Sequence, residues 1–366
     1  MIRASAPGKL VLIGEYAVLG GAPAAVMAVD RRARVEIVPS AGDRWSLAAP
    51  GLAPEPAEFS IDPGGRLIWE EDGRNAGERF GLVEAVVRGL TGAGVLDPAG
   101  LSPAAATLDT RAFFHDAGSG RDKLGLGSSA ALTVALASAL VAWAGEETPP
   151  NPQWLQALVN LHRGVQGGRG SGIDIAASLL GGVLRYQLDH HGQVSSAVPL
   201  RMPDELHVLG IWTGRSASTG EFLKRLEVCR REDPRAVEET LGRLGAISED
   251  GIVALEDSCS AAFLGAIGAF WQGLEDLGRV VGLPILSAEH RRLHRMAIEC
   301  GGSYKPSGAG GGDLGLVFSS EPEVVELVRG RAQAAGFQPL DLAVAPEGVR
   351  GRSNAPSISL SGNNLL

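Results

Sequence analysis

The stretch from Asp122 to Ala144, D-K-L-G-L-G-S-S-A-A-L-T-V-A-L-A-S-A-L-V-A-W-A, constrains the fold of this chain more than any other. It opens with Gly125, Gly127 and two serines and continues as a run of Ala, Leu and Val. Glycine lets the backbone approach a ligand closely, and the first helical turn has free N–H groups at the positive end of the helix dipole. The stretch therefore predicts a phosphate-binding loop before a helix, and the alternative is a capped, buried helix that binds nothing.

The two serines of this loop have different expected roles. Ser128 could cap the helix through its hydroxyl. Ser129 could place its hydroxyl on a magnesium ion or on a phosphate oxygen. Both interpretations require the two hydroxyls to lie where the helix begins.

The composition fits a protein without membrane segments or disulfides. The chain has 366 residues, 45% of them hydrophobic, and this length suggests two domains or two packed lobes. Its three cysteines lack CxxC spacing, which argues against a disulfide framework and a structural zinc site and suits the cytoplasm. We expect no signal peptide, and the most apolar segment, 130–144, is too short to span a bilayer. The net charge of -9 argues against non-specific nucleic-acid binding.

The order of the expected elements favours an α+β fold over a doubly wound parallel sheet. Strand-like patterns come first, over residues 2–38, and helical patterns dominate over 221–277 and 288–299, with further helices inserted between strands. We expect an N-terminal lobe at 1–195 and a C-terminal lobe at 196–352. The polar residues 353–366 are expected to form a flexible tail.

Two further glycine clusters lie toward the ends of the chain. They are A6-P-G-K-L-V-L-I-G-E-Y-A-V-L-G-G21 and K305-P-S-G-A-G-G-G-D-L-G315. Together with G125-L-G-S-S-A-A131, in this order and at these separations, they resemble the three signature motifs of the GHMP kinase superfamily over essentially the whole chain. The chain has neither a Walker A sequence nor the protein-kinase signature set, so it resembles neither of those two classes of kinase.

Within this superfamily the chain is most similar to the phosphomevalonate kinases. The segment G167-G-R-G-S-G-I-D-I-A-A-S-L-L-G-G182 resembles that family's catalytic-aspartate motif, and W212-T-G-R-S-A-S-T219 resembles its acceptor-side segment. Mevalonate kinases more usually carry a glutamate about eleven residues before the motif aspartate, as a magnesium ligand. Arg163 stands there in this chain, with Gln166 nearby. The departure leaves the magnesium carboxylate unassigned and favours the phosphomevalonate kinases.

The resemblance implies a fold and a reaction. The fold would be a two-lobed GHMP kinase fold, with a ribosomal protein S5 domain 2-like N-terminal lobe and a ferredoxin-like C-terminal lobe. The reaction would transfer a phosphoryl group from ATP, with Mg²⁺, to (R)-5-phosphomevalonate, giving 5-diphosphomevalonate for isoprenoid synthesis. The protein would be a cytoplasmic monomer or homodimer whose partners are ATP and this small molecule, with no nucleic acid and no membrane.

The resemblance also assigns roles to individual residues. Lys9, by itself an ordinary surface lysine, would be the cation beside the transferred phosphoryl group. Asp174, by itself a solvated loop aspartate, would be the catalytic carboxylate, and its apolar neighbours favour a buried functional group. The expected ATP-binding residues are Lys123, Gly125, Leu126, Gly127, Ser128, Ser129 and Ala130, with Ser129 also a ligand of Mg²⁺. The expected substrate-binding residues are Lys9, Arg169, Ser171, Gly172, Asp174, Ser216, Ser218, Thr219, Lys305, Ser307, Gly308, Ala309 and Gly310.

The chemistry of a phosphate acceptor sets the expected mechanism. A phosphate monoester has a second pKa near 6 and is mostly dianionic at neutral pH, so it needs deprotonation less than a hydroxyl acceptor does. Neutralising the repulsion between two anions should then matter more than a base. We therefore expect Lys9, Lys123, Arg169 and Lys305 to carry more of the rate than in a hydroxyl kinase.

Three alternatives remain at the level of the sequence. The first keeps the fold and changes the acceptor to mevalonate, a sugar or homoserine. The second is a catalytically silent sensor that binds ATP and a metabolite, and the third is a related decarboxylase. Lys9, Ser129 and Asp174 are all present, which disfavours the sensor. His162 is expected to be a structural histidine.

Overall fold

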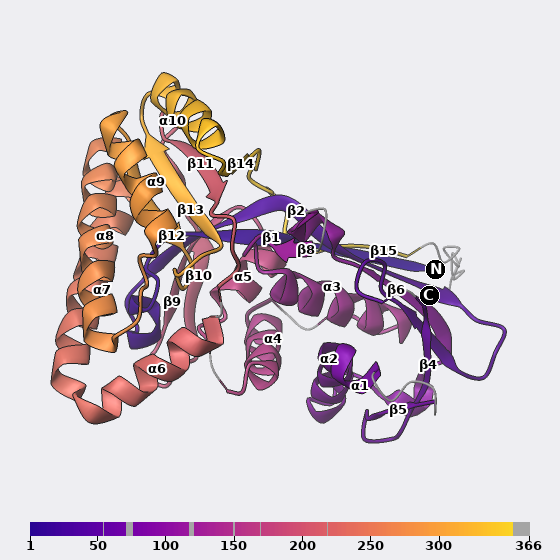
Figure 1. The fold of residues 1–366 in the computed structure, drawn as a ribbon. Coiled ribbons are helices and arrows are strands. Elements are labelled where there is room, and N and C mark those ends of the chain that lie inside the picture. Colours follow the sequence, from indigo (N-terminus) through magenta and orange to yellow (C-terminus); the bar gives the residue numbers. More distant parts are fainter. Residues whose placement is uncertain are drawn as a thin grey trace, which may run out of the picture.

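The computed structural model describes residues 1–53, 55–70, 76–116, 121–148, 151–168, 170–217 and 219–353. These residues form two α+β lobes, each built on one large sheet, and one hydrophobic core runs through both. Figure 1 shows β1 and β2 crossing the molecule from one lobe to the other. None of the helices within these ranges combines the length and the apolar character needed to cross a bilayer.

The N-terminal lobe contains a nine-stranded sheet among the described residues. Seven strands follow the order β10-β9-β2-β6-β3-β4-β5, and β1 pairs with β2 and with β15. The strands are β1 Ile2–Ile13, β2 Ala24–Pro39, β3 Trp45–Ala48, β4 Ala57–Ile61, β5 Leu67–Trp69, β6 Ala104–Asp109, β9 Val183–Leu188, β10 Val194–Pro199 and β15 Arg350–Ser353. The β1–β2 register shifts between Pro7 and Gly8, so β1 is irregular within the first glycine cluster.

Helices cover one face of this sheet. They are α1 Ala76–Arg79, α2 Gly81–Gly92, α3 Ser128–Trp143, α4 Asn151–Val165 and α5 Ile173–Leu180, with short 3₁₀ turns η1 Ala17–Gly20, η3 Pro98–Gly100 and η4 Arg111–Phe113. A small hairpin, β7 Phe114–Asp116 and β8 Arg121–Lys123, precedes α3. Eleven residues of α3 are buried, as its run of Ala, Leu and Val predicts, and the helix packs on β1 and β2.

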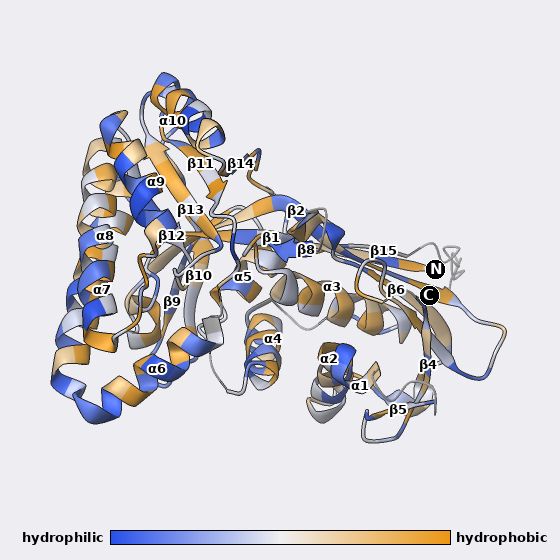
Figure 2. Ribbon diagram, viewed as in Figure 1, coloured by the Kyte–Doolittle hydropathy of each residue, from blue (hydrophilic) through white to orange (hydrophobic). Residues whose placement is uncertain are grey.

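The C-terminal lobe has an antiparallel four-stranded sheet in the order β12-β13-β11-β14, which is the strand order of a ferredoxin-like fold. Its strands are β11 His207–Trp212, β12 Ser303–Ser307, β13 Leu314–Ser319 and β14 Gln338–Leu340. Its helices are α6 Thr219–Glu232, α7 Pro234–Glu256, α8 Ser260–Val281, α9 Ala288–Glu299 and α10 Pro322–Ala334. Figure 2 shows β13 as hydrophobic and α9 with many hydrophilic residues, which is typical of an amphipathic helix on a buried sheet.

The lobe boundaries differ from those expected from the sequence. The predicted boundary at residue 195 falls inside β10, which pairs with β9 in the N-terminal sheet. The chain then returns at its end, because β15 pairs with β1 in the same sheet rather than belonging to the C-terminal lobe. Ser353, expected to begin a flexible tail, is the last residue of β15, and residues 354–366 lie outside the described residues.

The returning segment, residues 341–353, ties the C-terminal lobe to the back of the N-terminal lobe. The carbonyl of Ala345 accepts a hydrogen bond from Gly182 N–H at 2.7 Å, and Val349 N–H donates to the carbonyl of Leu179 at 3.1 Å. Gly348 lies so close to the end of α5 that a Cβ atom there would stand 2.0 Å from the Leu179 carbonyl oxygen. The segment therefore fits only where a glycine occupies position 348.

We predict that Gly348→Ala destabilises the protein by about 1–3 kcal/mol, because the backbone of α5 must move to admit the methyl group. Gly351→Ala is the matched control, since a Cβ atom at Gly351 meets nothing within 4 Å and this glycine has no positive φ. Thermal unfolding of both variants tests this. Equal melting temperatures for the two would contradict the close packing of the segment.

Candidate active site

A cavity of about 290 Å³ lies where the three glycine clusters meet between the lobes. Most of the residues expected to bind ATP or the acceptor line it. They are Lys9, Lys123, Gly125, Leu126, Gly127, Ser128, Ser129, Ser171, Asp174, Ser307, Gly308 and Ala309. The cavity therefore collects groups that lie up to 300 residues apart in the sequence.

The start of α3 forms one wall of the cavity. Gly125 and Gly127 have φ values of 75° and 78°, a left-handed conformation that side chains rarely adopt. Gly127 is the N-cap of α3, so the expected capping role of Ser128 is wrong. The first helical bond, from Ala131 N–H to the Gly127 carbonyl, leaves the preceding N–H groups without an intrahelical partner. The first turn thus offers hydrogen-bond donors and the positive end of the helix dipole to an anion.

Lys9 joins β1 to this loop. Its backbone N–H donates to the Leu126 carbonyl at 2.9 Å, and its Nζ donates to the Gly125 carbonyl at 3.4 Å. A Cβ atom on Gly127 would lie 3.2 Å from the Lys9 Cγ, and one on Gly308 would lie 3.8 Å from its Nζ. The ammonium group therefore lies between the second and third glycine clusters, where it can contact a phosphoryl group held by the loop.

Asp174 lies at the start of a second helix that faces the cavity. Gly172, the N-cap of α5, has a φ of 80° and leaves no room for a side chain, since a Cβ atom would stand 2.6 Å from Val159. The Ile175 N–H donates to the Asp174 carboxylate at 3.0 Å. A Cβ atom on Gly127 would lie 3.8 Å from the Asp174 Cβ and 3.2 Å from the Lys9 Cγ, so Gly127 lies between these two side chains.

Arg163 holds the segment that precedes Asp174. Its guanidinium donates to the carbonyls of Gly170, at 2.9 Å, and Ser171, at 3.2 Å. Tyr186 donates to the same Ser171 carbonyl at 2.6 Å, and burial raises the pKa of its hydroxyl. Arg163 stands where the resemblance would place a magnesium carboxylate, and here it supports the backbone of the segment before Asp174 instead.

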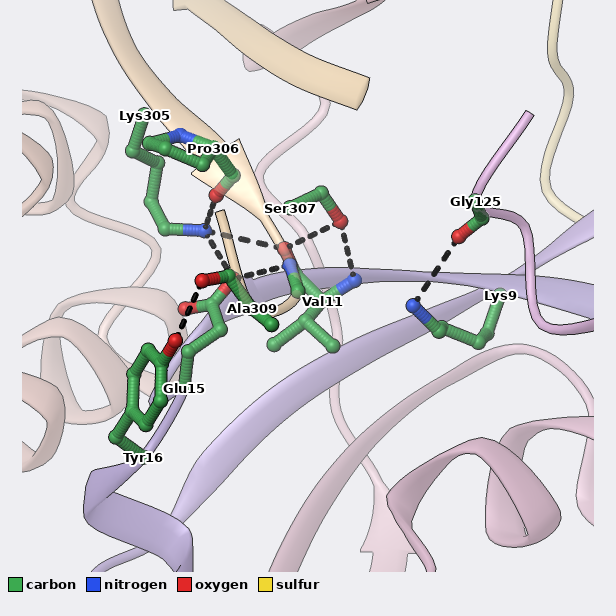
Figure 3. A network of polar contacts seen from close by, with 10 residues as sticks. Lys9, Val11, Glu15, Tyr16, Gly125, Lys305, Pro306, Ser307 and Ala309 are labelled. Atoms are coloured by element: carbon green, nitrogen blue, oxygen red, sulfur yellow. Dashed lines mark hydrogen bonds and ion pairs between the residues drawn. The ribbon is translucent and has the colours of Figure 1, made fainter. Parts of the chain in front are cut away.

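Lys305 does not have the role expected of it. This side chain is fully buried and absent from the cavity wall, and its Nζ donates to Glu15 Oε1 at 2.5 Å and to the carbonyls of Pro306 and Val11. Burial lowers the pKa of Lys305, and Glu15 opposes that effect. Figure 3 shows this ion pair within a network that links β1 to β12, with Lys9 beside Gly125 and outside it. Lys305 is therefore a structural residue rather than a substrate cation.

The same network holds the third glycine cluster against β1. Glu15 Oε1 also accepts the N–H of Gly308 at 3.2 Å, and the Tyr16 hydroxyl donates to the Ala309 carbonyl at 2.5 Å. The Ser307 hydroxyl accepts from Val11 N–H at 2.9 Å (Figure 3). These bonds fix the loop of the C-terminal lobe over a cavity whose floor belongs to the N-terminal lobe.

Asp313 also lines the cavity, although sequence reasoning gave it no role. Its carboxylate accepts the N–H of Ala217 at 3.1 Å, and its Cβ would stand 2.4 Å from a Cβ on Gly125. Burial raises the pKa of Asp313, while the Ala217 N–H, Lys9 and Lys123 lower it. Its φ of 56° is unusual for a residue other than glycine. The signal available in the sequence was a single aspartate at the end of a glycine run.

The other expected site residues fall into three groups. The Ser216 hydroxyl donates to the Lys123 carbonyl at 3.2 Å and supports the phosphate loop without lining the cavity. Buried residues behind the cavity wall are Ala130, Gly172 and Gly310. Arg169 and Ser218 lie outside the described residues, and Thr219 begins α6. Residues in the cavity wall that the sequence did not suggest include Glu15, Tyr16, Phe113, Gln166 and Leu223.

Comparison with known proteins agrees with this arrangement. Residues 118–182 match the family model for the N-terminal domain of GHMP kinases. The chain is 32% identical to a phosphomevalonate kinase from a Streptomyces species, over 94% of this chain and 97% of that protein. The chain belongs to the GHMP kinase family.

Two other relatives show how widely this fold is shared. A mevalonate kinase from Thermococcus sibiricus is 29% identical over 95% of this chain and 98% of that protein. The structure of Streptococcus pneumoniae phosphomevalonate kinase in complex with phosphomevalonate and AMPPNP covers 94% of this chain and 100% of its own, with a TM-score of 0.72 and 19% identity. As a GHMP kinase, the protein is expected to transfer a phosphoryl group from ATP to a small molecule.

The residues of the cavity fit ATP with a magnesium ion. Mg²⁺ prefers hard oxygen ligands and is usually held by one or two protein groups together with substrate phosphates. The hydroxyl of Ser129 and the carboxylates of Asp174 and Asp313 are such ligands, and all three line the cavity. Within the described residues no three His, Cys, Asp or Glu side chains form a cluster that could hold a metal by themselves.

We predict that Lys305→Met destabilises the protein by about 3–5 kcal/mol, because it leaves the Glu15 carboxylate buried without its cation. Lys224→Met, at an exposed position of α6, should change stability by no more than about 0.5 kcal/mol. The double variant Glu15→Leu, Lys305→Met should recover part of the loss. Chemical denaturation measures all three, and a Lys305→Met variant as stable as the control would refute the role of the ion pair.

His290 supports the third glycine cluster from behind. Its Nε2 donates to the Gly312 carbonyl at 2.9 Å, and its Nδ1 lies 2.8 Å from the Tyr304 hydroxyl. Burial lowers its pKa to about 4 from an ordinary value of 6.5, so the imidazole is neutral at pH 7. In this neutral form Nδ1 accepts the phenolic proton of Tyr304. The imidazole takes up a second proton less readily in the folded state than in the unfolded state.

We predict that stability is lost as the pH falls from 6.5 toward 4, because the unfolded state takes up a proton that the buried imidazole excludes. The pKa difference corresponds to about 3 kcal/mol. His290→Gln, whose amide can donate to Gly312 and accept from Tyr304, should lack this part of the pH dependence. His191→Gln, at an exposed turn position, should keep it. Unfolding free energies at pH 7 and pH 5 test the difference between the variants.

Proposed function

We propose that this protein phosphorylates (R)-5-phosphomevalonate with ATP and Mg²⁺, giving ADP and 5-diphosphomevalonate, and that it acts in the cytoplasm. The observation that carries the proposal is the meeting of Lys9, Asp174 and the first turn of α3 in one cavity. The 32% identity with a phosphomevalonate kinase over nearly the whole chain supports the choice of acceptor.

The proposed chemistry is positioning and charge neutralisation. The first turn of α3 would hold the ATP phosphates, and Mg²⁺ would bridge them. Lys9 would contact the transferred phosphoryl group from β1. Because the acceptor is already an anion at neutral pH, Asp174 would orient it or Lys9 and remove only a residual proton.

Charge within the cavity supports an essential metal ion. The charged side chains in the described part of the wall are Lys9, Lys123, Glu15, Asp174 and Asp313, and Glu15 is bound by Lys305. Two lysines therefore face two further carboxylates. A triphosphate and a phosphate monoester add several negative charges to this balanced wall. Mg²⁺ brought by the nucleotide would offset part of that charge.

A direct assay tests the acceptor. ADP release should be strong with ATP, Mg²⁺ and phosphomevalonate and weak with mevalonate at the same concentration. The reverse preference would keep the ATP site and overturn the proposed acceptor. If neither compound causes ADP release although the protein still binds ATP, both candidate acceptors are rejected.

Two substitutions test the division of labour. We expect Lys9→Met to lower kcat/KM by about 100- to 1000-fold, as for loss of a charge aimed at the transition state. Asp174→Asn should cost less than the roughly 100-fold typical of a lost general base. Asp204→Asn, at an exposed position, is the matched control and should leave the rate unchanged. A larger loss of kcat/KM in Asp174→Asn than in Lys9→Met would contradict a mechanism that depends mainly on cations.

A second candidate acceptor is mevalonate. The relative from Thermococcus sibiricus that favours it covers as much of this chain as the phosphomevalonate kinase does, at a slightly lower identity of 29%. A hydroxyl acceptor must lose its proton, so Asp174→Asn would then be the more damaging change. The same pair of variants therefore separates the two candidates.

A further inference from the structure

The hydroxyl of Ser129 has a buried partner on a different helix. Its Oγ lies 3.2 Å from Nε2 of His162, which projects from α4 toward the start of α3. His162 is 2% exposed, whereas Ser129 lines the cavity. The imidazole thus contacts the hydroxyl from behind, on the side away from any ligand in the cavity.

This contact decides which chemical face Ser129 presents to a ligand. A serine hydroxyl has one proton and two lone pairs. If His162 Nε2 carries a proton, it donates to the oxygen, and the serine proton is left to point at a phosphate. If Nε2 carries the lone pair, it accepts the serine proton, and both lone pairs of the oxygen remain for a cation. The tautomer of His162 therefore decides whether the Ser129 hydroxyl offers a ligand its proton or its lone pairs.

The surroundings of Ser129 favour the second arrangement. Hydrogen-bond donors for phosphate oxygens are already plentiful there, from the first turn of α3, Lys9 and Lys123. Oxygen lone pairs are the scarcer group at the start of α3, and a divalent cation bound to a nucleotide requires them. A proton acceptor behind a ligating group fixes its orientation and raises its basicity.

We propose that His162 is a positioning residue that accepts the hydroxyl proton of Ser129 and thereby turns the serine oxygen toward a divalent cation bound with ATP. The inference rests on the proposed binding of a metal–nucleotide complex in this cavity, and it is independent of the acceptor. Its experiments contain no acceptor, so their failure and a failure of the proposed reaction can be told apart.

The tautomer can be observed directly. The chain has seven histidines, and ¹⁵N-labelled histidine gives separate ring-nitrogen resonances for them. The resonance that disappears in His162→Gln belongs to His162. At neutral pH we expect its Nε2 to show the shift of an unprotonated ring nitrogen and its Nδ1 the shift of an N–H. A protonated Nε2 would overturn the proposal.

Binding of Mn²⁺ with AMPPNP, followed by the electron paramagnetic resonance signal of free Mn²⁺, tests the consequence. His162→Leu should weaken this binding by about 10-fold or more, the usual effect of removing the partner of a metal ligand. His162→Gln, whose side-chain oxygen can accept the same proton, should restore part of it. AMPPNP affinity in EDTA should stay within about twofold of the wild type, a difference of less than 1 kcal/mol.

A double-mutant cycle separates positioning from a merely structural role. In a Ser129→Ala background, His162→Leu should weaken Mn²⁺ binding by less than about twofold, because the hydroxyl it positions is gone. His191→Gln, at an exposed turn, is the histidine control and should bind as the wild type does. An equal loss from His162→Leu in both backgrounds, or a loss that persists in EDTA, would show that His162 only supports the fold.

Discussion

The buried ion pair between Glu15 and Lys305 is the interaction on which the rest of the site depends. Glu15 lies two residues after β1 in the first glycine cluster, and Lys305 begins the third cluster, 290 residues later. Removing two charges from water costs several kcal/mol each, which only close pairing and further hydrogen bonds can offset. Here Lys305 also donates to two carbonyls, and Glu15 accepts a backbone N–H of the third cluster. The pair therefore holds the two lobes in one fixed relation at the cavity.

Because the two lobes are held close together, several positions where they meet have room only for glycine. A Cβ atom on Gly8 would stand 2.7 Å from the Leu126 carbonyl oxygen, and one on Gly125 would meet the carboxylate of Asp313. The clusters are glycine-rich because three segments approach one another more closely than any side chain allows. The space so gained is occupied by backbone N–H groups and by Lys9, which are the groups that an anion requires.

The helices around the cavity divide its chemistry between donors and acceptors. The first turn of α3 supplies backbone donors, and Asp174, Asp313 and the Ser129 hydroxyl bring oxygen atoms to the cavity wall. Residues behind the wall, among them Arg163 and His162, set the geometry without facing the ligand. A metal–nucleotide complex needs both kinds of group side by side, since its phosphates accept hydrogen bonds and its cation accepts lone pairs.

The sequence by itself determined the local elements and most of the cavity wall. The apolar run after Ser129 predicted a buried helix, and the resemblance to the GHMP kinases implied that Lys9, Asp174 and the phosphate loop belong to one active site. Spacing along the chain cannot show which of two lysines faces a ligand, and the tertiary structure decided this. It buried Lys305 against Glu15, brought Asp313 to the wall, placed His162 behind Ser129 and returned residues 341–353 to the first sheet. Each of these outcomes depends on contacts between distant segments, whose energies come from burial and pairing rather than from local propensity.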